Sequence, residues 1–158
     1  MAWVTRVLET GGIVGGSEGK DGIRMGGILV IDDEPAIHKL IKMILEHEGF
    51  RVMGYGSGNG PVSKLLGERP DLIILDLLMP HVDGFAVFDM LRDPRYERWS
   101  RIPVVILTSV REEVSNRRYE LETGRKMDYA AYVEKPADPD ELLSLIERLV
   151  GKQDSGAE

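Results

Sequence analysis

The chain has 158 residues, a length that fits one domain with short extensions. Hydrophobic residues make up 42% of it, enough for a core, and the net charge of −7 argues against nucleic-acid or anionic-membrane partners, since both attract a positive surface. The absence of cysteine excludes disulfides, cysteine zinc sites and thiol nucleophiles. Because no apolar run approaches the roughly 20 residues of a membrane span and no signal-peptide core is present, we expect a cytoplasmic protein.

The beginning of the chain differs in composition from the rest. Residues 1–27 hold eight of the 18 glycines and show no sustained hydrophobic period, so ordering them would cost conformational entropy. We predict a flexible arm over residues 1–26, with one short helical turn at Trp3–Leu8. The folded domain is expected over 27–152 and a tail over 153–158.

From Ile28 onward, short apolar runs alternate with segments of helical periodicity. Strands are predicted at Ile28–Ile31, Phe50–Tyr55, Leu72–Leu75, Val104–Leu107 and Ala131–Val133. Helices are predicted from Pro35 to Gly49, at Val62–Leu66, Phe85–Leu91 and Arg111–Thr123, and from Pro139 to Gly151. This alternation predicts an α/β protein with a parallel sheet covered on both faces, a doubly wound three-layer domain.

Polar residues mark the ends of these helices. Asp33 or Glu34 can cap the helix that begins at Pro35, and Asp138 can cap the last helix. Gly124 is expected to end the helix predicted at Arg111–Thr123.

The residues that follow the strands carry the candidate chemistry, because ligands of such sheets bind at the carboxyl ends of the strands. Asp32 and Asp33 follow the first predicted strand, Asp76 the third, Thr108 the fourth, and Lys135 the fifth. The sequence therefore predicts three carboxylates, a hydroxyl and an ammonium at one edge of the sheet.

Three neighbouring carboxylates repel one another and need a counter-charge, which a hard cation such as Mg²⁺ supplies through oxygen ligands. Asp76 is the candidate nucleophile for a phosphoryl group, with Asp32 and Asp33 holding the metal. Lys135 and the Thr108 hydroxyl would then each stabilise one phosphoryl oxygen.

Each of these features also has a purely structural interpretation. The acidic run before Pro35 could serve only as a helix cap, Lys135-Pro136 as a turn, and Thr108-Ser109 as a cap for the next helix. Their joint occurrence at strand ends favours a site.

Four segments resemble the signature blocks of response-regulator receiver domains of two-component signalling: Ile31–Glu34, Leu75–Gly84, Leu107–Ser109 and Tyr132–Pro136. The resemblance extends over about residues 27–152. It implies a flavodoxin-like (βα)5 fold whose five-stranded parallel sheet has the order 2-1-3-4-5.

The resemblance also implies roles for individual residues. Asp76 would accept a phosphoryl group from a sensor histidine kinase or a phosphotransfer protein. Asp33, Asp76 and the main-chain carbonyl of Leu78 would bind Mg²⁺ directly, and Asp32 mostly through water.

Thr108 and Tyr132 resemble the family's switch pair, in which the hydroxyl moves to the phosphoryl group and the aromatic ring turns inward. Lys135 would pair with a phosphoryl oxygen, and its bond to Pro136 is expected to be cis. Phosphorylation would then change the face formed by the helix at Arg111–Thr123, the fifth strand and the last helix.

Two features depart from the family pattern. The stretch between Thr108 and Lys135 is a few residues longer than in compact members, with the extra residues expected around Glu122–Asp128. Leu78 stands where many receivers have a polar residue, which is expected to affect hydrolysis. His38 and His47 are interpreted as solvated residues of the first helix.

Eight residues follow Val150, so a single-domain receiver is expected, a monomer or weak homodimer acting on an unidentified output protein. It would catalyse only its own phosphorylation and dephosphorylation and would contact neither nucleic acid nor membrane. One alternative is a phosphatase of the haloacid-dehalogenase type, which would need an aspartate at the position of Leu78. A degenerate scaffold is a second alternative, against which Asp76, Thr108 and Lys135 argue.

Overall fold

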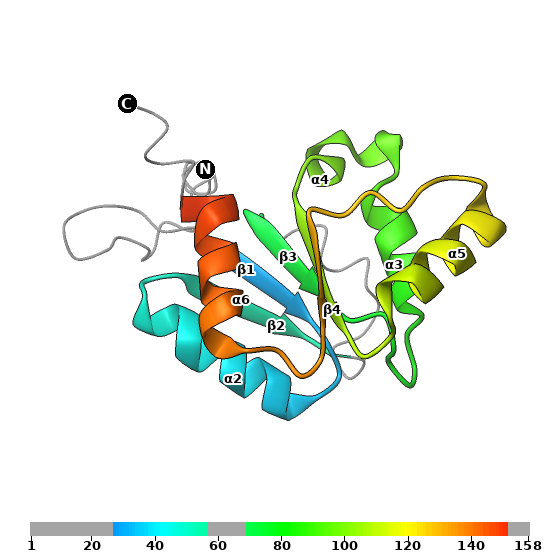
Figure 1. Cartoon of the computed structure of the whole chain (residues 1–158). Coiled ribbons are helices and arrows are strands. Elements are labelled where there is room, and N and C mark those ends of the chain that lie inside the picture. The colour runs from blue at the N-terminus through cyan, green and yellow to red at the C-terminus, as the bar shows by residue number, and fades with distance from the viewer. Residues whose placement is uncertain (1–26, 57–68, 152–158) are drawn as a thin grey trace.

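The structure is a computed structural model that describes residues 27–56 and 69–151 (Figure 1). Within these residues, five parallel strands form one sheet in the order β2-β1-β3-β4-β5, which confirms the predicted flavodoxin-like arrangement. The strands are β1 (Gly27–Ile31), β2 (Arg51–Tyr55), β3 (Leu72–Leu75), β4 (Val104–Thr108) and β5 (Ala131–Glu134).

The helices lie on both faces of this sheet, with α2 and α6 on one face and α3 and α5 on the other (Figure 1). Their bounds are α2 (Pro35–His47), α3 (Gly84–Leu91), the 3-10 helix η4 (Pro94–Tyr96), α4 (Glu97–Ser100), α5 (Glu112–Thr123), α6 (Pro139–Ile146) and the π-helical turn η5 (Glu147–Gly151). The helix predicted at Val62–Leu66, the arm over 1–26 and the tail over 153–158 lie outside the described residues.

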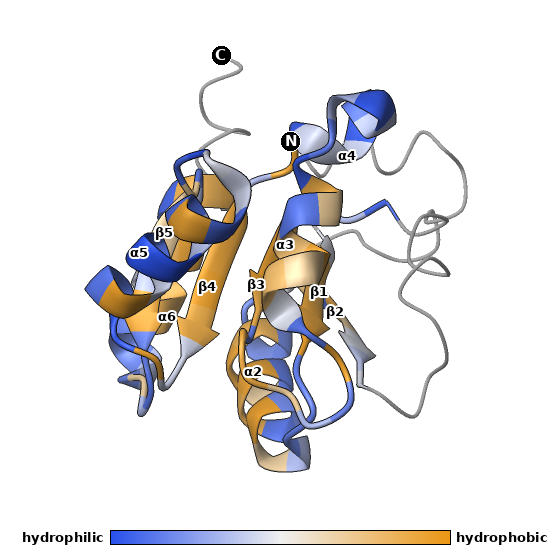
Figure 2. Cartoon of the chain, turned by 90° about the vertical axis from the view of Figure 1, so that its right-hand side faces the viewer, coloured by the Kyte–Doolittle hydropathy of each residue, from blue (hydrophilic) through white to orange (hydrophobic). Residues whose placement is uncertain are grey.

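The three central strands are buried along their whole length, because helices cover both of their faces (Figure 2). Successive side chains point to opposite faces, so Ile28 and Val30 join the cluster under α2 and α6, whereas Leu29 and Ile31 join the cluster under α3 and α5. Each fully buried Ile or Leu contributes about 1.5–3 kcal/mol, which makes these strands the most stable support for a site.

Two predicted helix ends, Asp138 at the start of α6 and Gly124 at the end of α5, are confirmed, whereas the predicted capping of α2 by the Glu34 side chain is wrong. Asp138 caps α6 by accepting hydrogen bonds from the amides of Asp140 and Glu141, as predicted. Glu34 occupies the cap position of α2, but its side chain makes no capping bond within the described residues, because its carboxylate contacts Lys135 instead.

The segment between α3 and β4 contains η4 and α4, which the sequence pattern did not predict. Asp93 caps η4, and Trp99 of α4 is buried against the sheet. The Arg92 guanidinium holds the segment in place by donating to the carbonyl of Ile102 at 2.6 Å, and burial lowers the pKa of this guanidinium. No helix in residues 27–56 or 69–151 is both long and apolar enough to cross a membrane.

Candidate functional site

The candidate site lies at the carboxyl ends of β1, β3, β4 and β5. Three main-chain hydrogen bonds continue the sheet one residue past its strands: from the Asp32 amide to Tyr55, from the Asp76 amide to Ile31, and from the Lys135 amide to Thr108. These bonds are 2.8–3.0 Å long and attach the three charged residues directly to the sheet. The position of each side chain is therefore set by the most buried part of the fold.

The Lys135 ammonium lies between three carboxylates. Its Nζ is 2.6 Å from Glu34 Oε1, 3.0 Å from Asp32 Oδ2 and 3.2 Å from Asp76 Oδ2, so each of its three N–H groups has an acceptor. The side chains of Asp32, Asp76 and Lys135 are 1%, 4% and 14% exposed, while that of Glu34 is 60% exposed. Lys135 is thus the counter-charge of the two buried carboxylates.

The surroundings of the site shift the pKa values of both Asp32 and Lys135. Burial raises the pKa of Asp32, and the hydrogen bonds from the Glu34 amide and Lys135 only partly oppose this effect. Burial alone would lower the pKa of Lys135, but the hydrogen bonds to Glu34 and Asp32 and the charge of Asp76 outweigh burial and raise it. Lys135 is therefore cationic at neutral pH, whereas Asp32 is costly to ionise.

Asp76 presents its two oxygens to different partners. Oδ2 faces Lys135, while Oδ1 accepts a hydrogen bond from the Leu78 amide at 3.0 Å. The turn after Asp76 is closed by a β-bridge between Leu78 and Asp83, and Gly84 packs so closely that a Cβ atom there would lie 2.4 Å from the Asp76 carbonyl oxygen. This tight turn fixes the direction of the Asp76 carboxylate.

An open cleft of about 680 Å³ leads to these groups. Its lining combines the charged residues, Asp33 among them, with the apolar residues Ile37, Leu40, Leu78 and Pro80. The side chain of Leu78 is half-exposed at this cleft. The cleft can therefore admit a small charged group beside an apolar contact surface.

Thr108 and Tyr132 occupy neighbouring strands. The Thr108 hydroxyl is buried and has no hydrogen-bond partner within the described part of the chain. The Tyr132 hydroxyl lies 2.7 Å from the carbonyl of Val110, to which it donates, and 2.7 Å from the Ser115 hydroxyl. A buried hydroxyl without a partner is rare in proteins, which marks Thr108 as a group that a ligand can satisfy.

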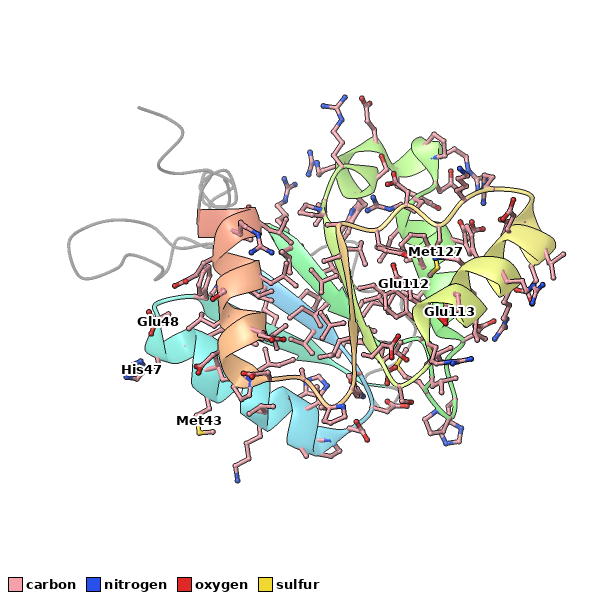
Figure 3. All side chains as sticks on the ribbon, viewed as in Figure 1. Met43, His47, Glu48, Glu112, Glu113 and Met127 are labelled. Atoms are coloured by element: carbon pink, nitrogen blue, oxygen red, sulfur yellow. The ribbon has the colours of Figure 1, made fainter. Side chains whose placement is uncertain are left out.

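The sequence pattern missed two contacts at the site. Glu34 was interpreted only as a helix cap, yet it is the nearest partner of Lys135. His38 was expected to be solvated, which is wrong: its Nε2 lies 2.5 Å from the Asp32 carbonyl oxygen, and its ring packs over Gly54, where a Cβ atom would clash. His47 is exposed as predicted and points away from the sheet (Figure 3). The expected cis bond between Lys135 and Pro136 is confirmed.

The fold and this set of side chains define a class of protein: a flavodoxin-like α/β domain with a buried acidic site at the carboxyl ends of its strands. The sequence model of the response regulator receiver domain matches residues 28–147. The chain therefore belongs to the family of response regulator receiver domains.

Curated relatives agree with this assignment. The DNA-binding dual master transcriptional regulator RpaA of Synechocystis is 36% identical over 130 residues, which cover 82% of this chain and 51% of RpaA. The DNA-binding response regulator MtrA of Mycolicibacterium smegmatis is 33% identical over 132 residues, covering 83% of this chain and 54% of MtrA. The chain thus spans about half the length of these relatives.

Solved structures show the same fold. The signal receiver domain of a signal transduction histidine kinase from Syntrophus aciditrophicus is 32% identical with a TM-score of 0.64, covering 80% of this chain and 91% of that domain. The receiver domain of sensor histidine kinase PA1611 from Pseudomonas aeruginosa, which holds a magnesium ion in its active-site cleft, is 26% identical with a TM-score of 0.65, covering 80% and 98%.

The relatives overturn one expectation. We excluded a nucleic-acid partner from the net charge of −7, but RpaA and MtrA are both DNA-binding regulators, so that exclusion was wrong. Net charge describes the average surface of this chain alone. It says nothing about the half of each relative that the chain does not match.

Proposed function

We propose that the chain is a phospho-accepting receiver of a two-component pathway or phosphorelay and that Asp76 is its phosphoacceptor. The observation that carries this proposal is the position of the Asp76 carboxylate: it is buried at the end of β3, faces the cleft and lies 3.2 Å from the Lys135 ammonium. Residues 27–152 would form the receiver unit.

The donor set at the site fits Mg²⁺. Within the described residues, no three His, Asp or Glu side chains form a metal-binding cluster by themselves. Mg²⁺, however, usually takes one or two carboxylates and fills its octahedron with water and other oxygens. We propose Asp33, Asp76 and the Leu78 carbonyl as direct ligands, with Asp32 acting through water. When bound, the ion would neutralise charge on the phosphoryl oxygens. The PA1611 receiver domain, which holds a magnesium ion in its active-site cleft, supports the choice of metal.

The protein's own groups account for the transfer. A carboxylate oxygen of Asp76 attacks the phosphorus of a phosphohistidine, a new O–P bond forms, and the N–P bond breaks with its electron pair going to the imidazole. Lys135 stays within reach of Asp76 and donates to one phosphoryl oxygen. The Thr108 hydroxyl, buried without a partner among the described residues, donates to another.

The hydrogen bond from Thr108 to the phosphoryl group would also transmit the signal to an output. Tyr132 is partly buried against the cluster under α3 and α5, and its hydroxyl is bound to Val110 and Ser115, so a shift of Thr108 would pass to the loop after β4 and to α5 through these hydrogen bonds. The face formed by α5, β5 and α6 would then change and control a target. A sensor histidine kinase or phosphotransfer protein would be the donor, and DNA is among the candidate targets, since RpaA and MtrA bind it.

Incubation with acetyl phosphate and Mg²⁺, followed by mass spectrometry of the intact chain, tests the proposal. The chain should gain one phosphoryl group, Asp76→Asn should abolish the gain, and the exposed control Asp140→Asn should retain it. An adduct that persists in Asp76→Asn would overturn the assignment. Steady turnover of p-nitrophenyl phosphate would favour the phosphatase alternative instead.

A further inference from the structure

The turn between β1 and α2 carries Asp32 and Asp33, two of the proposed Mg²⁺ ligands. The Asp32 side chain is held by Lys135 at 3.0 Å from Oδ2 and by the Glu34 amide, which donates to Oδ1 at 2.8 Å. These contacts fix the Asp32 carboxylate. They do not fix the plane of the peptide bond that joins Asp32 to Asp33.

That peptide bond is held through the main chain of Asp32. The Asp32 amide donates to the carbonyl of Tyr55 in β2 at 3.0 Å, and the Asp32 carbonyl lies 2.5 Å from His38 Nε2. A carbonyl oxygen can only accept, so His38 Nε2 carries the proton and donates it. Because the Asp32 carbonyl is part of the planar unit that includes the amide and Cα of Asp33, His38 sets the orientation of the chain where Asp33 begins.

The position of the His38 ring depends on β2, which lies beside α2 (Figure 1). The ring lies over Gly54, where a Cβ atom would be only 2.6 Å from Nδ1. Gly56 leaves similar space next to the acidic turn, since a Cβ atom there would lie 3.1 Å from Asp33 Oδ1 and 3.3 Å from the Asp32 carbonyl oxygen. A side chain at position 54 would therefore push the ring away from the carbonyl that it holds.

We infer that His38 is a positioning residue for the metal site: its hydrogen bond to the Asp32 carbonyl keeps the Asp33 carboxylate in place for Mg²⁺. This inference rests on the proposed function, in which Asp33 binds the ion directly. Residues that orient metal ligands typically account for about 10–100-fold in metal affinity. The Asp32 side chain keeps its own bonds without His38, so the loss of His38 should act through Asp33.

Calorimetry of Mg²⁺ binding to His38→Met and His38→Gln tests the inference. The two side chains are uncharged, similar in length and similar in helix propensity, but only glutamine has an N–H donor. His38→Met should weaken Mg²⁺ binding by about tenfold or more. His38→Gln should recover most of this affinity, and the control Lys42→Gln, at an exposed position of the same helix, should bind Mg²⁺ as wild type does.

The carbonyl ¹³C signal of Asp32 gives a second readout, which needs no metal. Because this signal responds to hydrogen bonding at the carbonyl, it should shift in Mg²⁺-free His38→Met and stay in place in Lys42→Gln. The free energy of unfolding in urea is measured for each variant, so that affinities are compared only between folded chains.

Gly54→Ala reaches the same hydrogen bond from the neighbouring strand. Its Cβ would displace the ring, so Mg²⁺ binding should weaken in Gly54→Ala. In His38→Ala the ring is gone, and adding Gly54→Ala should cause no further loss, as expected for two residues that act through one contact. Additive losses in the double variant would contradict the inference.

Unchanged Mg²⁺ affinity in His38→Met would overturn the inference. Equal losses in His38→Met and His38→Gln would also overturn it, because they would show that the ring only fills the space over Gly54. A wild-type chain that does not bind Mg²⁺ overturns the proposed metal site together with the inference, whereas binding that His38→Met leaves unchanged overturns the inference alone.

Discussion

Lys135 Nζ lies 3.0 Å from Asp32 Oδ2, although 103 positions separate the two residues in the chain. Both side chains are largely buried, and the same ammonium also reaches Asp76. The site is therefore assembled around a cation that balances carboxylates from two other strands.

Lys135→Met should destabilise the chain in Mg²⁺-free buffer by about 3 kcal/mol, because two buried carboxylates would lose their counter-charge. The free energy of unfolding in urea measures this loss, and Lys39→Met, at an exposed position of α2, is the control. Adding Mg²⁺ should raise the free energy of unfolding of Lys135→Met more than that of wild type, because in the variant no ammonium competes with the ion for the carboxylates. An unchanged urea midpoint would contradict the role of Lys135 as counter-charge.

Gly84→Ala should be among the most damaging small substitutions. The new Cβ would lie 2.4 Å from the Asp76 carbonyl oxygen and 2.5 Å from the Leu77 Cα, and these main-chain atoms cannot move aside cheaply. We expect a loss of about 3 kcal/mol together with slower phosphorylation, because the turn that directs Asp76 must shift. Gly124→Ala, at a φ of +75° with open space around it, should cost only about 1–2 kcal/mol. Equal losses in the two variants would argue against the close contact at Gly84.

Leu78→Asn should shorten the lifetime of the phosphoryl group on Asp76. Leu78 is half-exposed at the cleft and offers no polar group to orient an attacking water, whereas an amide there would. Loss of the phosphoryl mass with time gives the rate. Leu78→Ala separates two explanations: if it accelerates hydrolysis as much as Leu78→Asn does, shielding by the leucine side chain is the cause and the orientation argument is wrong.

Tyr129 gives the chain a stability that is lost at alkaline pH. Burial and the hydrogen bond to Glu112 raise the pKa of Tyr129 to about 12, so the unfolded chain loses this proton first, near pH 10. The contribution is complete below pH 10 and is lost as the pH rises toward 12. The urea midpoint should therefore fall less between pH 8 and 11 in Tyr129→Phe than in wild type. Tyr96→Phe, at a half-exposed site, should follow the wild-type curve.

The regular part of the fold could be predicted from the sequence because its pattern is local. The run at Leu72–Leu75 is apolar on every residue, as a strand buried on both faces must be, and its predicted bounds are confirmed. Gly124 ends α5 in the left-handed conformation, which also follows from residue type. The short helices between Asp93 and Arg101 were missed because a turn or two of charged residues around Trp99 has no period to detect.

The candidate site was only partly accessible to sequence reasoning. Strand-end positions indicated which charged residues meet, since parallel strands bring their carboxyl ends together. The direction of Glu34 toward Lys135 and of Glu134 toward Glu112 could not be predicted, because each depends on a partner distant along the chain. The contact of His38 with the Asp32 carbonyl likewise requires the space that Gly54 leaves on the neighbouring strand.

The small burial of α5 has a consequence for how such proteins diverge. Ser115 and Tyr119 are its only buried residues, so most of its surface can be substituted at a cost of only a few tenths of a kcal/mol. The charged residues of the site, in contrast, extend directly from the buried sheet and tolerate little change. The exposed positions of α5 can therefore change in sequence while the charged site keeps its geometry, so the two parts of the domain can diverge at different rates.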